Sequence, residues 1–200
     1  MYKYLSTSCQ ETTVINKSRF ICLLFPCNSK AEVKAQLQQL KVQHPKADHY
    51  CYAYLLDENK IQKYSDDGEP AKTAGWPMLD VLLKNNMDDI LAVVVRYFGG
   101  IKLGAGGLSK AYRSCVATAL KNCELFEKIE VPLYQLTVDY HQSDQVKNFL
   151  AVNCTLLAVN YKEKVEFSFY CLQTSVLSAL EELNVGFDQK ISTLIKIVKS

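Results

Sequence analysis

The sequence has no long apolar run, and this absence limits where the protein can work. Its apolar runs, such as residues 90–95, are far shorter than the ~18 residues of a membrane-spanning helix. The first residues contain no apolar core of the kind that a secretory signal peptide needs. With 48% hydrophobic and 22% charged residues, the 200-residue chain has an ordinary globular composition. We therefore expect a soluble cytoplasmic protein without a membrane partner.

Metal-binding and hydrolase patterns are also missing. The eight cysteines include no C-x-x-C pair, and there are only three histidines. We therefore expect reduced, structural cysteines, no metal site and no cofactor. His49 and Cys51 alternate on one face of a predicted strand and could point together into a site. Because no G-x-S-x-G elbow accompanies them, a structural histidine is the favoured interpretation.

Acidic residues are absent from residues 90–123, although that stretch contains five lysines and arginines. Residues 1–128 have 17 basic and 13 acidic side chains, whereas residues 129–200 have 6 and 8, so the positive charge lies in the first part. A stretch of one sign that contains glycine turns can attract phosphates or an acidic partner. A solvated basic helix face is the simpler alternative.

Hydrophobic periodicity predicts two domains, at residues 1–128 and 129–200. In the first, strand patterns at 11–16, 19–26, 50–56, 61–64 and 90–97 are interspersed with helical patterns. The helices are expected from a capping box at Ser29 and Glu32 up to His44, then at 73–85 and 106–122.

The second domain reads β-α-β-β-α-β, the order of a ferredoxin-like unit. Its strands are expected at 133–140, 155–161, 165–171 and 191–198, and its first helix at 143–152. Val176, Leu180 and Leu183 give the stripe of a second helix, which Gly186 would end.

Glycine is rare outside residues 64–112, which contain seven of the eight glycines. Glycine marks backbone that turns sharply or approaches something closely. Within this segment, an acidic loop (residues 66–75) places Asp66, Asp67 and Glu69 around an Asp-Gly turn. These carboxylates could hold Mg²⁺ or act as acid and base. Alternatively, they cap their own turn and the next helix.

A basic loop (residues 96–107) follows a predicted buried strand and leads into a helix. Free N–H groups and the dipole at a helix N-terminus make an anion site. The dinucleotide-binding pattern fails because Ser109 stands where its last glycine belongs, and the P-loop pattern fails because Ala105-Gly106 replaces Lys-Ser/Thr. We expect the acidic and basic loops to meet in one anion-facing site.

Several blocks occur in order along residues 18–112: Ser18-Arg19-Phe20, His49-x-Cys51-x-Ala53-Tyr54, Asp66-Asp67-Gly68-Glu69-Pro70, Thr73-Ala74-Gly75-x-Pro77, and residues 96–108 with Ala111-Tyr112. Together they closely resemble the YigZ/IMPACT family. The resemblance implies an α+β protein, with a first domain like domain two of ribosomal protein S five and a ferredoxin-like C-terminal domain. Eukaryotic IMPACT relatives regulate translation in the stress response to amino-acid starvation, whereas bacterial relatives have no settled biochemical activity.

These observations favour a binding or regulatory protein linked to translation, which contacts RNA, the ribosome or a translation factor and has no DNA sequence specificity. Its ligand- or anion-binding residues would be Arg96, Tyr97, Gly99, Gly100, Lys102, Gly104, Gly106, Gly107, Lys110 and Arg113. The acidic loop would contribute Asp66, Asp67, Glu69 and Thr73, with Arg19, His49 and Cys51 in support. The alternative is an enzyme that acts on a phosphorylated small molecule or nucleotide with Mg²⁺. The resemblance implies a first-domain fold that is shared with a group of small-molecule kinases, whose glycine-rich loop likewise caps a helix. The sequence favours binding over catalysis, because Gly107-Leu108 stands where that kinase loop has its serines.

Overall fold

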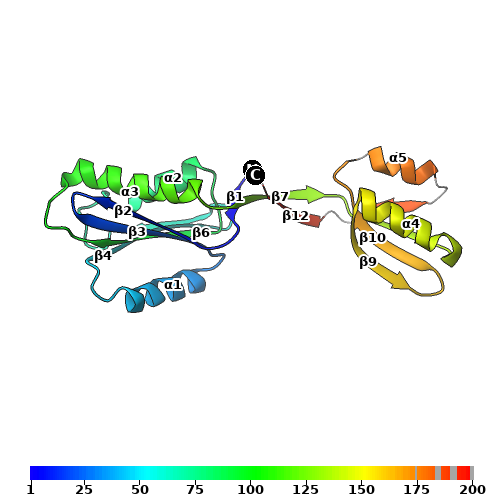
Figure 1. Ribbon diagram of the computed structural model, residues 1–200, viewed down its shortest axis with the longest axis horizontal. Coiled ribbons are helices and arrows are strands. Elements are labelled where there is room, and N and C mark those ends of the chain that lie inside the picture. Colours follow the sequence, from blue (N-terminus) through cyan, green and yellow to red (C-terminus); the bar gives the residue numbers. More distant parts are fainter. Residues whose placement is uncertain (174, 183–185, 190–192, 199–200) are drawn as a thin grey trace. The chain divides into compact units, whose positions relative to one another are not determined.

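A computed structural model describes residues 1–173, 175–182, 186–189 and 193–198 of the protein (Figure 1). The chain divides into two compact units: Met1–Lys128 with the last residues of the chain, and Ile129–Lys196. None of the helices in the described ranges is long and apolar enough to cross a membrane.

The first unit is built on a five-stranded antiparallel sheet with the strand order β2-β3-β6-β4-β5. Its strands are β2 (Cys9–Ile15), β3 (Ser18–Pro26), β4 (His49–Leu56), β5 (Ile61–Ser65) and β6 (Ile90–Tyr97). Central β6 is buried from Ile90 to Arg96 and pairs with β3 and β4. Its β-branched run is typical of a strand packed on both faces.

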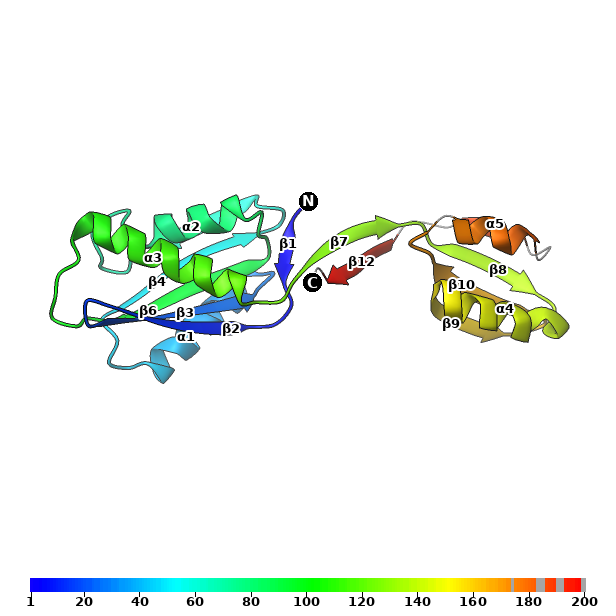
Figure 2. The same ribbon diagram turned by 45° about the horizontal axis from the view of Figure 1, so that its top comes forward.

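Helices cover both faces of this sheet (Figures 1 and 2). Helices α2 (Gly75–Lys84) and α3 (Gly104–Lys121) pack on one face, and α1 (Lys30–Gln43) packs on the other. The capping box of α1 is confirmed, since Ser29 Oγ accepts the Glu32 N–H at 3.3 Å. The Glu32 carboxylate in turn accepts the N–H of Asn28 at 2.9 Å. As predicted, His44 ends the helix as its C-cap.

The second unit contains a four-stranded antiparallel sheet with the strand order β11-β8-β10-β9. Its elements are β8 (Tyr134–Val138), α4 (Tyr140–Asn153), β9 (Thr155–Tyr161), β10 (Val165–Tyr170), α5 (Ser175–Glu182) and β11 (Phe187–Gln189). This β-α-β-β-α-β order confirms the α+β class with a ferredoxin-like C-terminal part.

The last strand of this unit was predicted in the wrong place. Short β11 (Phe187–Gln189) closes the four-stranded sheet, whereas β12 (Thr193–Val198) joins β1 (Lys3–Leu5) and β7 (Leu125–Val131) in a separate sheet, in the order β1-β7-β12. A three-residue strand gives almost no periodic signal, so the prediction assigned the last strand to the longer apolar run that follows it in sequence. Leu183 and residues 191–192 of the predicted elements lie outside the described residues.

The expectation of reduced cysteines is wrong for four of the eight. Cys9 forms a disulfide with Cys123, and Cys154 forms one with Cys171. The first pair is 114 residues apart in sequence, and it forms because the start of β2 lies beside the end of α3. The remaining thiols are free and buried: Cys22, Cys27, Cys51 and Cys115.

Candidate functional site

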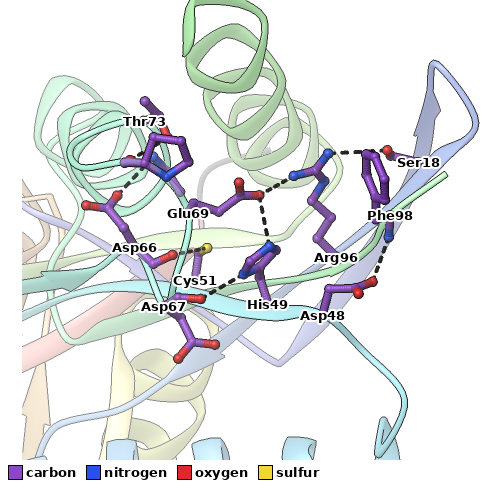
Figure 3. A network of polar contacts seen from close by, with 12 residues as sticks. Ser18, Asp48, His49, Cys51, Asp66, Asp67, Glu69, Thr73, Arg96 and Phe98 are labelled. Carbon is purple, nitrogen blue, oxygen red and sulfur yellow. Dashed lines mark hydrogen bonds and ion pairs between the residues drawn. The ribbon is translucent and has the colours of Figure 1, made fainter. Parts of the chain in front are cut away.

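The acidic and basic loops meet at a buried ion pair, as the sequence predicted (Figure 3). Arg96 Nη1, at the end of β6, donates to Glu69 Oε1 of the acidic loop at 2.5 Å. The two side chains are only 5% and 4% exposed. The hydroxyl of Tyr112 on α3 donates to the same glutamate oxygen at 2.7 Å. A strand, a loop and a helix are therefore fixed together by one carboxylate.

A cavity of about 370 Å³ lies beside this ion pair, at the start of α3. We call it the glycine-loop cavity, and it is lined by His49, Glu69, Pro70, Arg96, Phe98, Lys102, Leu103, Gly104, Ala105 and Leu108. Arg96 Nε is buried and has no hydrogen-bond partner among the described residues. No side chain caps the first turn of α3, and that turn contains no acid. Glu69 balances the charge of Arg96, so among the described residues the unmatched groups of the cavity are the Nε–H of Arg96, the ammonium of Lys102 and the uncapped start of α3.

Glycines shape the wall of this cavity in different ways. A Cβ on Gly99 would lie 2.0 Å from the backbone carbon of Lys17, so only glycine lets the basic loop pass the β2–β3 turn. Gly104 opens α3 at a φ of +69°, which side chains rarely adopt. Gly100 lies on the basic loop, and Gly107 lies in the first turn of α3.

Gly106 is a different case, because the fold itself does not require glycine there. A Cβ at this position would meet no atom within 4 Å, and the backbone is not in the left-handed region. Glycine within a helix costs roughly 0.5–1 kcal/mol relative to alanine. Its presence on the exposed first turn leaves the helix amides open to a ligand from outside the chain.

Among the predicted cations, some have no acidic partner in the described residues and one already has one. Lys102 and Lys110 are exposed and make no ion pair within the described part of the chain. Arg113 binds Asp80 of α2, which also accepts a hydrogen bond from Lys84 at 2.9 Å. The hydrogen bonds from Lys84 and Arg113 lower the pKa of Asp80. Arg113 is therefore already partly neutralised.

Asp66 holds the acidic loop and the start of α2. Its carboxylate accepts three backbone N–H groups, those of Lys72 at 2.8 Å, Ala74 at 3.0 Å and Gly75 at 2.8 Å. The arrangement favours the capping interpretation of this aspartate over metal binding.

The other polar groups of the acidic loop are also engaged. Asp67 accepts the N–H of Tyr50 at 2.7 Å, and the Thr73 hydroxyl donates to the carbonyl of Pro70 at 2.6 Å. Among the described residues, no three metal-ligating side chains come together. The donor set of the loop does not fit Mg²⁺, because its carboxylates are directed to backbone N–H groups and to Arg96.

His49 and Cys51 both lie beside the acidic loop. His49 Nδ1 is 2.8 Å from the carbonyl oxygen of Asp67, and its Nε2 is 4.0 Å from Glu69. The Cys51 thiol donates to the carbonyl of Asp66 at 3.0 Å. Burial raises the pKa of Cys51 far above its ordinary value, so it is not an activated nucleophile.

Two predicted residues lie away from the cavity. Tyr97 follows Arg96 on β6, so its side chain points to the α1 face, where its hydroxyl is 2.9 Å from His44 Nδ1. The Arg19 guanidinium stacks 4.3 Å from the centre of the Tyr97 ring. Phe98, in contrast, lines the cavity and is 46% exposed.

Several residues of the site were missed at the level of sequence. Tyr112 gives the second hydrogen bond to Glu69, 43 positions away. Ser18 Oγ accepts the N–H of Gly99 at 3.1 Å, and Asp48 accepts the N–H of Phe98 at 2.8 Å. The contacts of Ser18 and Asp48 span 81 and 50 positions, so no local pattern indicates them, although Ser18 and Tyr112 both stand in the sequence blocks that carry the family resemblance.

Comparison with known proteins gives two family matches. The model of the Impact N-terminal domain matches residues 16–120, and that of a domain of unknown function, DUF1949, matches residues 136–184. The chain is 45% identical over 163 residues to the IMPACT family member YvyE of Bacillus subtilis, covering 80% of this chain and 75% of that protein. It is 42% identical over 139 residues to the IMPACT family member YigZ of Escherichia coli, covering 68% of each.

A solved structure, described as the crystal structure of a hypothetical protein, is similar along almost the whole length. It is 31% identical, has a TM-score of 0.61, and the match covers 94% of this chain and 97% of that one. Similarity also extends to the protein IMPACT homolog of Dictyostelium discoideum, at 40% identity over 99 residues, which cover 47% of this chain and 28% of that protein.

Proposed function

The chain belongs to the IMPACT family, and from this premise we propose that it is a binding protein linked to translation. Its contact surface is the glycine-loop cavity with the exposed start of α3. This surface fits the phosphate groups of RNA. The RNA is either part of the ribosome or bound to a translation factor. The protein acts by binding its partner rather than by catalysing a reaction.

The observation that carries this proposal is the surplus of donors in the glycine-loop cavity. The Nε–H of Arg96 is buried and unpaired among the described residues, and the first turn of α3 has no cap. An unpaired buried donor is costly, by about 1–3 kcal/mol. A phosphate oxygen would remove that cost and would also interact favourably with the positive end of the helix dipole.

The surrounding side chains suit the same ligand. Lys102 lines the cavity, and Lys110 lies four residues after Gly106, on the same side of α3. Phe98 presents a half-exposed ring on which a base can stack. The link to translation is supported by the resemblance to IMPACT proteins, whose eukaryotic members regulate translation.

Sedimentation with ribosomes tests the proposal. The purified protein is centrifuged with ribosomes through a sucrose cushion at about 50 and 200 mM salt, with and without nuclease treatment of the ribosomes. We expect co-sedimentation that falls steeply with salt, because the contacts are phosphate contacts. Lys102→Ala/Lys110→Ala should remove most of the binding. Lys60→Ala is the matched control, because Lys60 is exposed and already paired with Asp57 and Glu58.

The outcomes separate the possible partners. Loss of binding after nuclease treatment supports RNA as the contacted component, whereas binding that survives nuclease supports a ribosomal protein or factor. Binding that is insensitive to salt, or equal in the double variant and the wild type, would contradict the proposal.

A further inference from the structure

A second groove lies on the other face of the five-stranded sheet, between α1, β4 and β5. It has a volume of about 400 Å³. We call it the lysine groove, and the residues that define it are Lys30, Lys34, Lys41, Lys63, Tyr52 and Tyr54. The lysines at 30, 34 and 41 come from one side of α1, and Lys63 comes from β5.

The register of β4 separates this groove from the glycine-loop cavity. Cys51 and Ala53 pack toward α2 and α3, so the intervening Tyr52 and Tyr54 point to the α1 face. Tyr54 lies opposite Lys63 in the β4–β5 pair. Side chains of the two sites therefore lie on opposite faces of one sheet, and the groove can be tested independently.

The charge of the groove is of one sign. No acid lines it, and none of its four lysines makes an ion pair within the described residues. Five other lysines of the chain do have carboxylate partners: Lys60, Lys84, Lys128, Lys162 and Lys164.

The neighbouring acid of α1 does not neutralise the groove. Glu32 is directed to the backbone N–H of Asn28 at the start of the helix. Lys30 and Lys34 are like charges at i and i+4, a spacing that destabilises a helix. A bound polyanion would reverse the sign of this interaction.

The floor of the groove is aromatic. The Tyr52 and Tyr54 rings are nearly parallel, with an interplanar angle of 7° and centroids 6.3 Å apart. Tyr54 is only 5% exposed, and the partly exposed Tyr52 stacks against it. Val33 and Leu37 add apolar side chains to the lining of the groove.

Cations around an aromatic platform are the combination that binds nucleotides, because phosphates contact the lysines while a base stacks on the ring. An acidic peptide would use the charges and leave the platform without a role. We propose that the lysine groove binds a nucleotide of single-stranded RNA, with its base on Tyr52 and the adjoining phosphates on Lys34 and Lys63.

Fluorescence anisotropy with a labelled single-stranded RNA of about 12 nucleotides tests this proposal on the full chain carrying Lys102→Ala/Lys110→Ala, in which the glycine-loop cavity no longer contributes. Adding Lys34→Ala/Lys63→Ala to this parent should weaken binding roughly tenfold or more, because each lysine loses one phosphate contact. The slope of log affinity against log salt should fall by about 1.4, the value for two single-strand contacts. Lys60→Ala, in the turn between β4 and β5, is the control and should bind as the wild type does.

Tyr52→Leu separates stacking from charge, because it keeps an apolar side chain and removes the ring. We expect it to weaken RNA binding roughly fivefold or more, with an unchanged salt slope. Heparin, which has charge but no bases, should bind equally well to this variant and the wild type. A thermal unfolding midpoint like that of the wild type shows that each variant is folded.

Three results would overturn the assignment: no RNA binding at low salt by Lys102→Ala/Lys110→Ala, no further loss when Lys34→Ala/Lys63→Ala is added to it, or no further loss when Tyr52→Leu is added to it. Stabilisation by a nucleoside monophosphate that the groove variants lose would support the same chemistry with a free nucleotide as its source. Because Lys102→Ala/Lys110→Ala leaves the lysine groove intact, it should keep the groove's share of RNA binding. The two sites can therefore fail separately.

Discussion

Glu69→Ala tests the buried ion pair on which the candidate site is built. The carboxylate accepts from Arg96 at 2.5 Å and from the Tyr112 hydroxyl at 2.7 Å. Its removal leaves a guanidinium that is 5% exposed without a counter-charge, which costs about 3–5 kcal/mol. The stranded hydroxyl adds about 1 kcal/mol. We therefore expect the free energy of unfolding of the first unit to fall by about 4–6 kcal/mol.

The double variant Glu69→Met/Arg96→Met separates two effects on stability: the loss of the ion pair itself, and the cost of leaving Arg96 buried without a counter-charge. Buried ion pairs replaced by apolar residues of similar volume are often neutral or stabilising. The double variant should therefore be more stable than Glu69→Ala by at least about 2 kcal/mol. Glu11→Ala is the control for a surface carboxylate and should change the free energy of unfolding by less than about 1 kcal/mol.

Urea unfolding followed by tryptophan fluorescence measures these differences. Trp76 is the only tryptophan and lies in α2, so its signal reports the first unit without the second. This selectivity matters because a chain of two units need not unfold in one step. A loss below about 1 kcal/mol in Glu69→Ala would refute the reasoning, since it would mean that water already solvates Arg96.

Three further predictions follow from individual positions. Gly106→Ala should stabilise the first unit by about 0.5–1 kcal/mol in urea unfolding yet weaken ribosome co-sedimentation; a destabilised variant with full binding would contradict the role given to this glycine. Native protein at pH 8 should not be alkylated by iodoacetamide at Cys27 or Cys115, because burial raises their pKa to about 12 and about 11 and the thiolate forms only as pH approaches those values; modification detected by mass spectrometry without denaturant would contradict this. In thermal shift assays with nucleotides and Mg²⁺ we expect no stabilisation that depends on Asp66, because backbone N–H groups occupy its carboxylate; a shift lost in Asp66→Asn would support the enzyme alternative.

Elements with a strong local signal could be predicted from sequence. The buried run of β6 and the capping box of α1 depend on neighbouring residues, and both lie where the pattern placed them. Strands β1 and β11 are three residues long, and their pairing partners are distant in sequence, so periodicity did not reveal them.

In the candidate site, too, some features could be predicted from sequence and others depend on distant residues. The meeting of the two loops followed from their glycines and opposite charges. The ion pair of Arg96 did not, because no local pattern indicates that this arginine is buried against Glu69, 27 positions away. The side of the sheet on which Tyr97 lies could have been inferred, since it alternates with Arg96 along one strand.

The central claim is that phosphate groups bind at the backbone amides that begin α3. Two-dimensional ¹⁵N NMR of the labelled protein, titrated with single-stranded RNA, tests it directly, because glycine amides resonate in a sparsely populated region of the spectrum. We predict saturable shifts of the Gly104, Gly106 and Gly107 amides that diminish between about 50 and 200 mM salt and disappear in Lys102→Ala/Lys110→Ala. If these three amides remain unshifted while RNA is bound elsewhere on the protein, the account of the glycine-loop cavity is contradicted.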